Sequence, residues 1–230
     1  MLAQRVTRAG VTVGDATRRL AKTLAEATLP HSLVVWRGPP GIRRVALTFD
    51  DGPTDLTRDY LDVLDRVGAR ATFFVIGELC DRNPAIVAEM AKRGHELASH
   101  GYTHRKFPDL HKLGLLDDEL TRTAGLLPPS TRHRHRPIVR PPHGAVSLKS
   151  FVACARAGFT TVLWSLDSGD WRTQRTTDVV AAVVGREVEP GAIVLLHEGQ
   201  AWTLDALRTI VGRLKEAGHE LVTVGELLGR

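Results

Sequence analysis

Residues 45–53 read Val45-Ala46-Leu47-Thr48-Phe49-Asp50-Asp51-Gly52-Pro53, an apolar run followed directly by two acids and a turn. A short apolar run of this kind is typical of a strand buried on both faces, as in a parallel sheet. A dinucleotide-binding fold would carry a glycine-rich phosphate loop after its first strand, whereas paired aspartates stand there in this chain. The segment therefore indicates a parallel α/β sheet with acids at a strand end.

Outward from this segment, apolar runs and amphipathic segments alternate along the chain. We expect strands at residues 45–49, 71–76, 95–99, 138–140, 160–165, 192–196 and 220–223. We expect helices at residues 57–67, 84–93, 111–126, 147–157, 176–186 and 204–217. Such alternation predicts about seven parallel strands covered by helices, and an open doubly wound sheet and a closed barrel both fit it.

The composition is that of a globular chain and excludes several other classes. Of 230 residues, 43% are hydrophobic and 25% are charged, which excludes disordered, collagen-like and coiled-coil chains. Two cysteines are too few for a disulfide scaffold. No run approaches the roughly 20 apolar residues that a membrane helix needs.

The net charge of +5 belongs to the N-terminal segment. Residues 1–44 hold 8 basic and 2 acidic residues, and the remainder is nearly neutral, which argues against a nucleic-acid partner. We expect residues 1–32 to form a basic extension with a helix at 12–28, and residues 33–230 to form the main domain. No signal peptide is visible, so we expect a cytoplasmic protein. The extension leaves room for weak contact with the inner membrane surface.

Ionisable side chains follow five of the expected strands. They are Asp50 and Asp51, then His100 and His104, then Arg140 and His143, then Asp167 and Asp170, which Trp171 follows, and finally His197. Active sites of βα barrels gather at the carboxyl ends of the strands. We therefore expect these side chains to form one site.

The pair His100 and His104 indicates a metal site. Four-residue spacing on a helix-like turn would point both imidazoles the same way. Asp50 or Asp51 could add a carboxylate, giving a His-His-carboxylate face with open positions. Adjacent residues of an extended segment point in opposite directions, so one aspartate could bind the metal while the other faces the substrate water. His197 is placed to protonate a leaving group.

Five segments together resemble the polysaccharide deacetylase family, the NodB-homology domain of carbohydrate esterase family four. They read Thr48-Phe49-Asp50-Asp51-Gly52-Pro53, His100-Gly101-Tyr102-Thr103-His104, Arg140-Pro141-Pro142-His143-Gly144, Asp167-Ser168-Gly169-Asp170-Trp171 and Ile193-Val194-Leu195-Leu196-His197. They occur in the family's order, and the resemblance covers residues 33–230. It implies a distorted (β/α) barrel and a metal-dependent hydrolase that removes N-acetyl or O-acetyl groups from sugars, cleaving the carbon–nitrogen bond of an amide in the first case.

The resemblance also implies a role for each site residue. Asp50 would be the general base and His197 the general acid, acting from opposite sides of the barrel mouth, with Arg140 tuning Asp50 and Asp170 orienting His197. Asp51, His100 and His104 would bind one divalent metal ion, zinc first and cobalt, manganese, nickel or iron as alternatives. The substrate side chains would be Trp171, Leu195, His143 and Tyr102, with a backbone N–H near His143 facing the oxyanion.

Three positions depart from the family pattern. Gly101 replaces the usual serine or threonine, His143 replaces an aromatic residue, and Glu198 stands where aspartate is common. None of these changes removes a catalytic group. Two other readings stay open: a non-haem iron enzyme on the same ligand set, and an inactive carbohydrate-binding relic. The motifs leave open which acetylated sugar, glycan or precursor is the substrate, and the oligomeric state.

Overall fold

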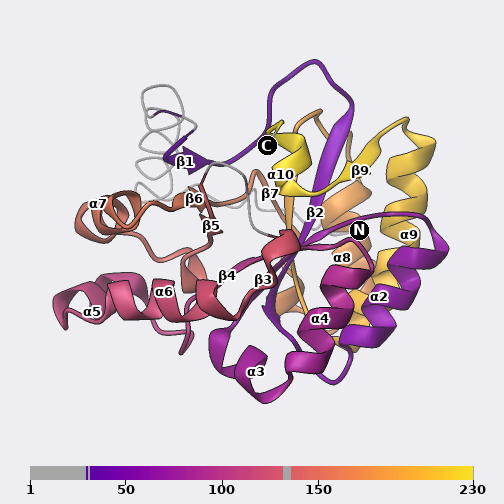
Figure 1. The fold of residues 1–230 in the computed structure, drawn as a ribbon. Helices are drawn as coiled ribbons and strands as arrows, with labels where there is room; N and C mark the ends of the chain where they lie inside the picture. The colour runs from indigo at the N-terminus through magenta and orange to yellow at the C-terminus, as the bar shows by residue number, and fades with distance from the viewer. Residues whose placement is uncertain (1–29, 31, 132–135, 230) are drawn as a thin grey trace, which may run out of the picture.

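The computed structural model describes residues 30, 32–131 and 136–229 (Figure 1). The expected basic extension, apart from residues 30 and 32, and its helix at 12–28 lie outside this range. Among the described residues, no helix combines the length and the apolar character needed to cross a bilayer.

Within the described part of the chain, nine parallel strands form one curled sheet, with the order β1-β6-β5-β4-β3-β2-β8-β7 and with β9 pairing with β2. The strands are β1 (Val34–Val35), β2 (Arg44–Gly52), β3 (Thr72–Val75), β4 (Glu96–Ser99), β5 (Ile138–Val139), β6 (Thr160–Val162), β7 (Leu166–Asp167), β8 (Ile193–His197) and β9 (Glu220–Val222). The predicted distorted (β/α) barrel is confirmed. The predicted count of seven missed β1 and β7, which are two residues long and show no periodicity of their own.

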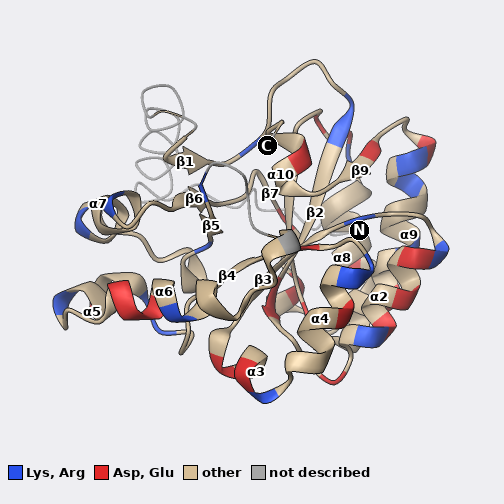
Figure 2. Ribbon diagram, in the orientation of Figure 1, with Lys and Arg blue, Asp and Glu red and all other residues tan. Residues whose placement is uncertain are grey.

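Helices cover the outside of the sheet in two groups (Figure 1). They are α2 (Thr57–Arg66), α3 (Gly77–Arg82), α4 (Pro84–Lys92), α5 (Phe107–Lys112), α6 (Leu116–Leu126), α7 (Leu148–Arg156), α8 (Thr176–Val184), α9 (Ala201–Glu216) and α10 (Val224–Leu227). The α2, α4, α8 and α9 helices pack together, as do α5, α6 and α7. In Figure 2, basic and acidic residues both lie on α2, α4 and α9.

Local sequence explains where several helices begin and end. The α4 helix begins with Pro84, whose fixed φ suits a first turn. The α7 helix begins with a capping box, in which the Ser147 side chain accepts from the Ser150 backbone N–H. The expected helix at 111–126 divides at Gly114, because its φ of +70° lies in the left-handed region.

Strand β2 lies at the centre of the sheet and separates two hydrophobic layers. Its residues Val45, Leu47 and Phe49 face the helices, whereas Ala46 faces the barrel interior with Phe74 of β3. Alternation along the strand then places Thr48 and Asp50 on the interior face. The first acid of residues 45–53 thus points into the barrel at its carboxyl end.

Candidate active site

Asp50 forms a buried ion pair with Arg140. The Arg140 guanidinium donates to Asp50 Oδ1 at 2.7 Å and to Thr48 Oγ1 at 2.8 Å. It also donates to the carbonyls of Val162 and Leu163 and stacks over the Phe74 ring at 4.0 Å. Arg140 is fully buried, and these bonds compensate for removing its charge from water. The pair leaves Asp50 Oδ2 facing His100, with 3.7 Å between Oδ2 and Nε2.

The predicted metal ligands converge at the end of β2. Asp51 Oδ1 lies 3.0 Å from His104 Nε2 and 3.5 Å from His100 Nε2. One ligand atom from each of the three residues lies within 4.8 Å of the others. Burial acts to raise the pKa of Asp51, but the two imidazoles more than offset it and hold this pKa well below its usual range.

The two aspartates do not point in opposite directions, as simple alternation predicted. The pairing of β2 with β3 shifts register between Asp50 and Gly52, and Asp51 has a φ of 72°. This irregularity turns the Asp51 carboxylate toward the same imidazole that Asp50 faces. A bulge in β2, which the sequence does not predict, therefore brings both aspartates into one site.

The segment His100–His104 is not a helical turn, which corrects the expected reason for the histidine spacing. Gly101 has a φ of 80° and His104 a φ of 60°, and the segment runs as a turn between β4 and α5. His100 Nδ1 lies 2.8 Å from the carbonyl oxygen of Arg140. That contact places a proton on Nδ1, so Nε2 keeps its lone pair for a metal.

These residues fit a divalent metal ion. Asp51 Oδ1 is buried and has no hydrogen-bond partner among the described residues, and a lone carboxylate oxygen in such a place is costly unless a cation is bound. Two neutral imidazoles and one carboxylate are the donor set of open zinc and iron sites. The structure thus supplies a three-ligand face, and it does not select the metal.

His197 forms a tight pair with Asp170. His197 Nδ1 lies 2.7 Å from Asp170 Oδ1, and the His197 backbone N–H donates to Asp170 Oδ2 at 2.7 Å. Thr203 Oγ1 donates to the same Oδ2, and the Trp202 indole donates to the Asp170 carbonyl. Burial acts to lower the pKa of His197, but the Asp170 carboxylate raises it above its ordinary value, with help from Asp50 and Asp51.

Asp50 and His197 are neighbours, which corrects the expectation that they act from opposite sides of the barrel mouth. They are register partners on the parallel strands β2 and β8. Their side chains therefore leave the sheet on the same face. A carboxylate and an imidazole thus lie side by side at one strand end, next to the cluster of Asp51, His100 and His104.

One cavity of about 680 Å³ joins these groups. It is lined by Asp50, Asp51, His100, His104, Lys106, His143, Gly144, Trp164, Asp167, Trp171, Leu195, His197 and Gln200. Trp171, Leu195 and His143 are among its lining residues, and the His143 ring centroid lies 4.6 Å from that of His104. Sequence reasoning missed Lys106, Trp164 and Gln200, although Lys106 and Gln200 lie two and three residues after a motif and Trp164 lies within an expected strand.

Tyr102 does not line this cavity. Its hydroxyl donates to Asp81 at 2.6 Å, and the Arg122 guanidinium stacks on its ring at 3.6 Å from the centroid. The expected substrate contact of Tyr102 is therefore not supported by its position. Its place within the second motif did not reveal that the side chain turns toward α3 and α6.

Glu198 lies buried behind the first motif. Thr57 Oγ1 donates to its Oε1 at 2.6 Å, and its Oε2 has no hydrogen-bond partner among the described residues. A Cβ at Gly52 would lie only 1.7 Å from Oε2, so the glutamate requires glycine there. Burial raises the pKa of Glu198 to about 8, which keeps this carboxyl protonated at neutral pH.

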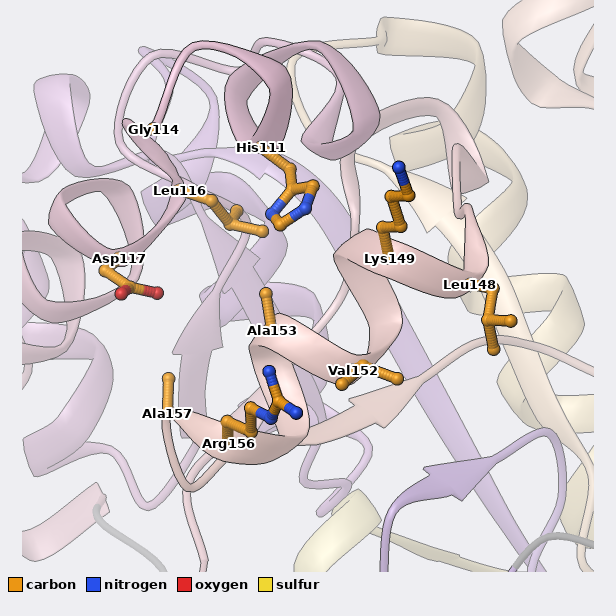
Figure 3. Close-up of a pocket in the computed structure, with 10 residues that line it drawn as sticks. All are labelled: His111, Gly114, Leu116, Asp117, Leu148, Lys149, Val152, Ala153, Arg156 and Ala157. Carbon is orange, nitrogen blue, oxygen red and sulfur yellow. The ribbon is translucent and has the colours of Figure 1, made fainter.

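A second surface pocket, of about 660 Å³, lies between the α5 and α6 helices and α7 (Figure 3). His111 and Leu116 face Ala153 across it, and Lys149 and Arg156 lie along its α7 side. None of the predicted site residues lines it. Despite its similar size, it is therefore a weaker candidate than the cavity lined by Asp50, His197 and the Asp51–His100–His104 cluster.

Comparison with known proteins gives a consistent result. Residues 37–162 match the family model described as polysaccharide deacetylase. A peptidoglycan-N-acetylglucosamine deacetylase of Bacillus cereus is 36% identical over 206 residues, covering 86% of this chain and 94% of the relative. A chitooligosaccharide deacetylase of Bradyrhizobium is 38% identical over 204 residues, covering 81% and 91%. Peptidoglycan-N-acetylglucosamine deacetylases of Listeria monocytogenes are 34% identical, and the match spans 91% of this chain and 44% of their length.

Solved structures share the fold. A crystal structure of a peptidoglycan N-acetylglucosamine deacetylase superposes with a TM-score of 0.77 at 28% identity, covering 86% of this chain and 94% of that one. A pseudoenzyme of carbohydrate esterase family four from Bacillus anthracis superposes with a TM-score of 0.73 at 25% identity, covering 85% and 69%. The predicted amide-hydrolase class is the class for which the enzymatic relatives are named. With a family match over more than half of its length and a relative of similar size at 36% identity, the chain belongs to the polysaccharide deacetylase family.

Proposed function

We propose that this protein is a metal-dependent deacetylase that hydrolyses the acetamido group of N-acetylglucosamine units in a glycan. One observation carries the proposal: the Asp51–His100–His104 cluster, the Asp50–Arg140 pair and the His197–Asp170 pair all border one cavity. The names of the relatives support N-acetylglucosamine of peptidoglycan or of chitooligosaccharides as the substrate class.

Asp51, His100 and His104 would hold the metal, and zinc is the ion that we propose. A divalent cation bound there supplies Lewis-acid polarisation of a carbonyl and lowers the pKa of a bound water. The chain's own contribution is to present the three ligands already converged. The Arg140 carbonyl sets the tautomer of His100, so its Nε2 is a ligand rather than a donor.

Asp50 acts as the general base. Its Oδ1 is taken by Arg140, and its Oδ2 faces the metal ligands. The free oxygen is thus the one that can accept a proton from the attacking water. Arg140 is rigidly held by its four other acceptor and ring contacts, so it fixes the plane of the carboxylate during proton transfer.

His197 acts as the general acid. An amine is a poor leaving group until it is protonated, so amide hydrolysis needs a proton donor beside the scissile nitrogen. Asp170 raises the pKa of His197 and thereby keeps the imidazole protonated nearer to neutral pH. Because Asp50 and His197 are neighbours on β2 and β8, one substrate position can reach both.

The walls of the cavity suit an acetyl group on a sugar. Leu195 is 3% exposed and offers an apolar wall, while Trp171 is 56% exposed and offers a ring face at the mouth. Sugars stack readily on such exposed aromatic faces, because their axial C–H groups form an apolar surface. We assign Leu195 to the methyl group of the acetyl and Trp171 to the sugar ring.

The test is acetate release by zinc-reconstituted protein from chitin oligomers, peptidoglycan fragments and O-acetylated sugars, with Asp50→Asn as the control. We expect metal-dependent release from the N-acetylated substrates and none from Asp50→Asn, which keeps all three metal ligands. Release from the O-acetylated sugars alone would replace amide hydrolysis by ester hydrolysis. Tight glycan binding with no release in any divalent metal would instead identify an inactive binding protein.

A further inference from the structure

The segment His100–His104 carries two of the three proposed metal ligands but has no regular structure of its own. His104 adopts a φ of 60°, in the left-handed region that few residues other than glycine adopt, although histidine does so more often than most. Residues held in such a conformation persist only where the surroundings impose it. Some contact outside the segment must therefore keep His104 turned toward Asp51.

Glu119, on α6, makes that contact from behind the segment. Its Oε2 accepts from the backbone N–H of Tyr102 at 2.6 Å and from that of Thr103 at 2.9 Å. Its Oε1 accepts from the Thr103 hydroxyl at 2.6 Å. Glu119 is only 7% exposed, so three bonds satisfy a carboxylate with little access to water. Bonds to an ionised acceptor are about twice as strong as neutral ones.

The opposite side of the segment is held by α3. The backbone N–H groups of Gly77 and Glu78 donate to the carbonyls of Gly101 and Tyr102, each at 3.0 Å. A Cβ at Gly77 would lie 2.4 Å from the Tyr102 ring, so glycine is required for this approach. The peptide at Tyr102 is thus held on both sides, its N–H by Glu119 and its carbonyl by α3.

Gly101 makes room for this arrangement. A Cβ on Gly101 would lie 3.4 Å from Glu119 Oε2 and 3.2 Å from the Phe107 ring, on a backbone already at a φ of 80°. A larger residue would therefore crowd the Phe107 ring and strain the turn, while it would just reach contact with the Glu119 carboxylate.

We propose that Glu119 is a positioning residue for the metal site: its carboxylate holds the backbone of residues 102–103 and so keeps His104 in place beside Asp51 and His100. Glu119 touches neither metal nor substrate. This inference rests on the proposed metal site, and it predicts that loss of the carboxylate weakens metal binding by loosening the segment before any substrate is present.

The test compares three variants of the full chain with the wild type. Glu119→Ala removes all three bonds. Glu119→Gln keeps the side-chain volume and one acceptor oxygen, and its amide can still face the Thr103 hydroxyl. Asp118→Asn is the matched control, because it removes one negative charge from the preceding, exposed position of the same helix. The readouts are the zinc dissociation constant by chelator competition, and amide hydrogen exchange of residues 101–104 in metal-free protein.

We expect Glu119→Ala to weaken zinc binding by about 10–100-fold, the usual cost of losing a group that orients a metal ligand. We expect Glu119→Gln to lie between Glu119→Ala and the wild type, and Asp118→Asn to match the wild type. Exchange at residues 101–104 should rise in the same order. If Glu119→Ala does not fold, the same comparison is made between Glu119→Gln and Asp118→Asn.

Two outcomes would overturn the inference. One is zinc affinity in the Glu119 variants equal to that of Asp118→Asn, and the other is unchanged exchange at residues 101–104. A lower unfolding temperature without either change would assign Glu119 a purely structural role. If the wild type itself does not bind zinc, the proposed function fails on its own, and the exchange measurement still decides whether Glu119 holds the segment.

Discussion

Two histidines of the cavity, His100 and His197, each have an oxygen atom within 2.8 Å of Nδ1, but the oxygen belongs to a different kind of group in each case. His100 Nδ1 lies 2.8 Å from the backbone carbonyl of Arg140, and His197 Nδ1 lies 2.7 Å from the carboxylate of Asp170. A backbone carbonyl that accepts from Nδ1 fixes the tautomer and leaves the lone pair on Nε2, which suits a metal ligand. A carboxylate also stabilises the positive form, which suits an acid.

The difference shows that the second partner of a histidine sets its role. Burial of the His197 ring by itself acts to lower its pKa, because it favours the neutral form. At His197 the Asp170 carboxylate overrides that effect and raises the pKa. Removing each ring, and then changing the partner of His197, should therefore separate the proposed metal site from the proposed acid.

The largest effect is expected on the metal side, from His100→Ala. We expect this protein to lose zinc, and kcat/KM to fall by about 10³-fold or more, because Lewis-acid stabilisation is worth several kcal/mol. Metal content by atomic absorption and acetate release check both points. Full zinc occupancy in a folded His100→Ala protein would show that the ligand assignment is wrong.

The next effect is expected on the acid side, from His197→Ala. This protein should keep its zinc, since His197 is not in the ligand cluster, while kcat falls by about 10²–10⁴-fold, the usual contribution of general acid catalysis. The loss should be greatest for substrates with poor leaving groups, which a series of acetanilides would show. A uniform loss across the series would contradict the assignment of His197 as the proton donor.

Sequence reasoning found both histidines because each follows an apolar strand, and parallel strands end at one edge. It did not predict the backbone conformation of the residues around them. The positive φ values of Asp51 and His104 arise from a bulge in β2 and from contacts made by other elements. No residue pattern within residues 50–51 or 100–104 indicates them, and alternation along an extended strand predicted the opposite arrangement of the two acids.

In the fold, too, some features were predicted from the local sequence and others depend on tertiary contacts. The β1 and β7 strands are two residues long, and their pairing partners β6 and β8 lie far away along the chain, so their place in the sheet depends on tertiary structure. The sequence did not predict a role for Glu119, because it lies 15 residues from His104 along the chain, among the acidic residues of an expected helix. Its contacts with residues 102–103 depend on where α6 packs, which the local sequence does not predict.

A smaller effect is expected from Asp170→Asn, which keeps a partner at His197 but removes its charge. Because Asp170 raises the pKa of His197, its loss lowers that pKa, and the protonated acid then disappears at lower pH. The alkaline limb of the kcat/KM profile should move toward acid by about one to three pH units. The pH profile of acetate release checks this, with zinc content as the control. An unmoved alkaline limb would assign that limb to another group.

The smallest effect is expected from Thr203→Val, which tests how firmly Asp170 itself is held. Thr203 is fully buried, and its hydroxyl donates to Asp170 Oδ2 at 2.9 Å. The His197 N–H and the Trp202 indole still hold Asp170 in this variant, so we expect a loss of about 1 kcal/mol in the free energy of unfolding. The alkaline limb should move in the same direction as in Asp170→Asn but less far, because the carboxylate remains. Thr121→Val, at an exposed position of α6, is the matched control, and a limb that moves equally in both valine variants would exclude Thr203 from the acid's support.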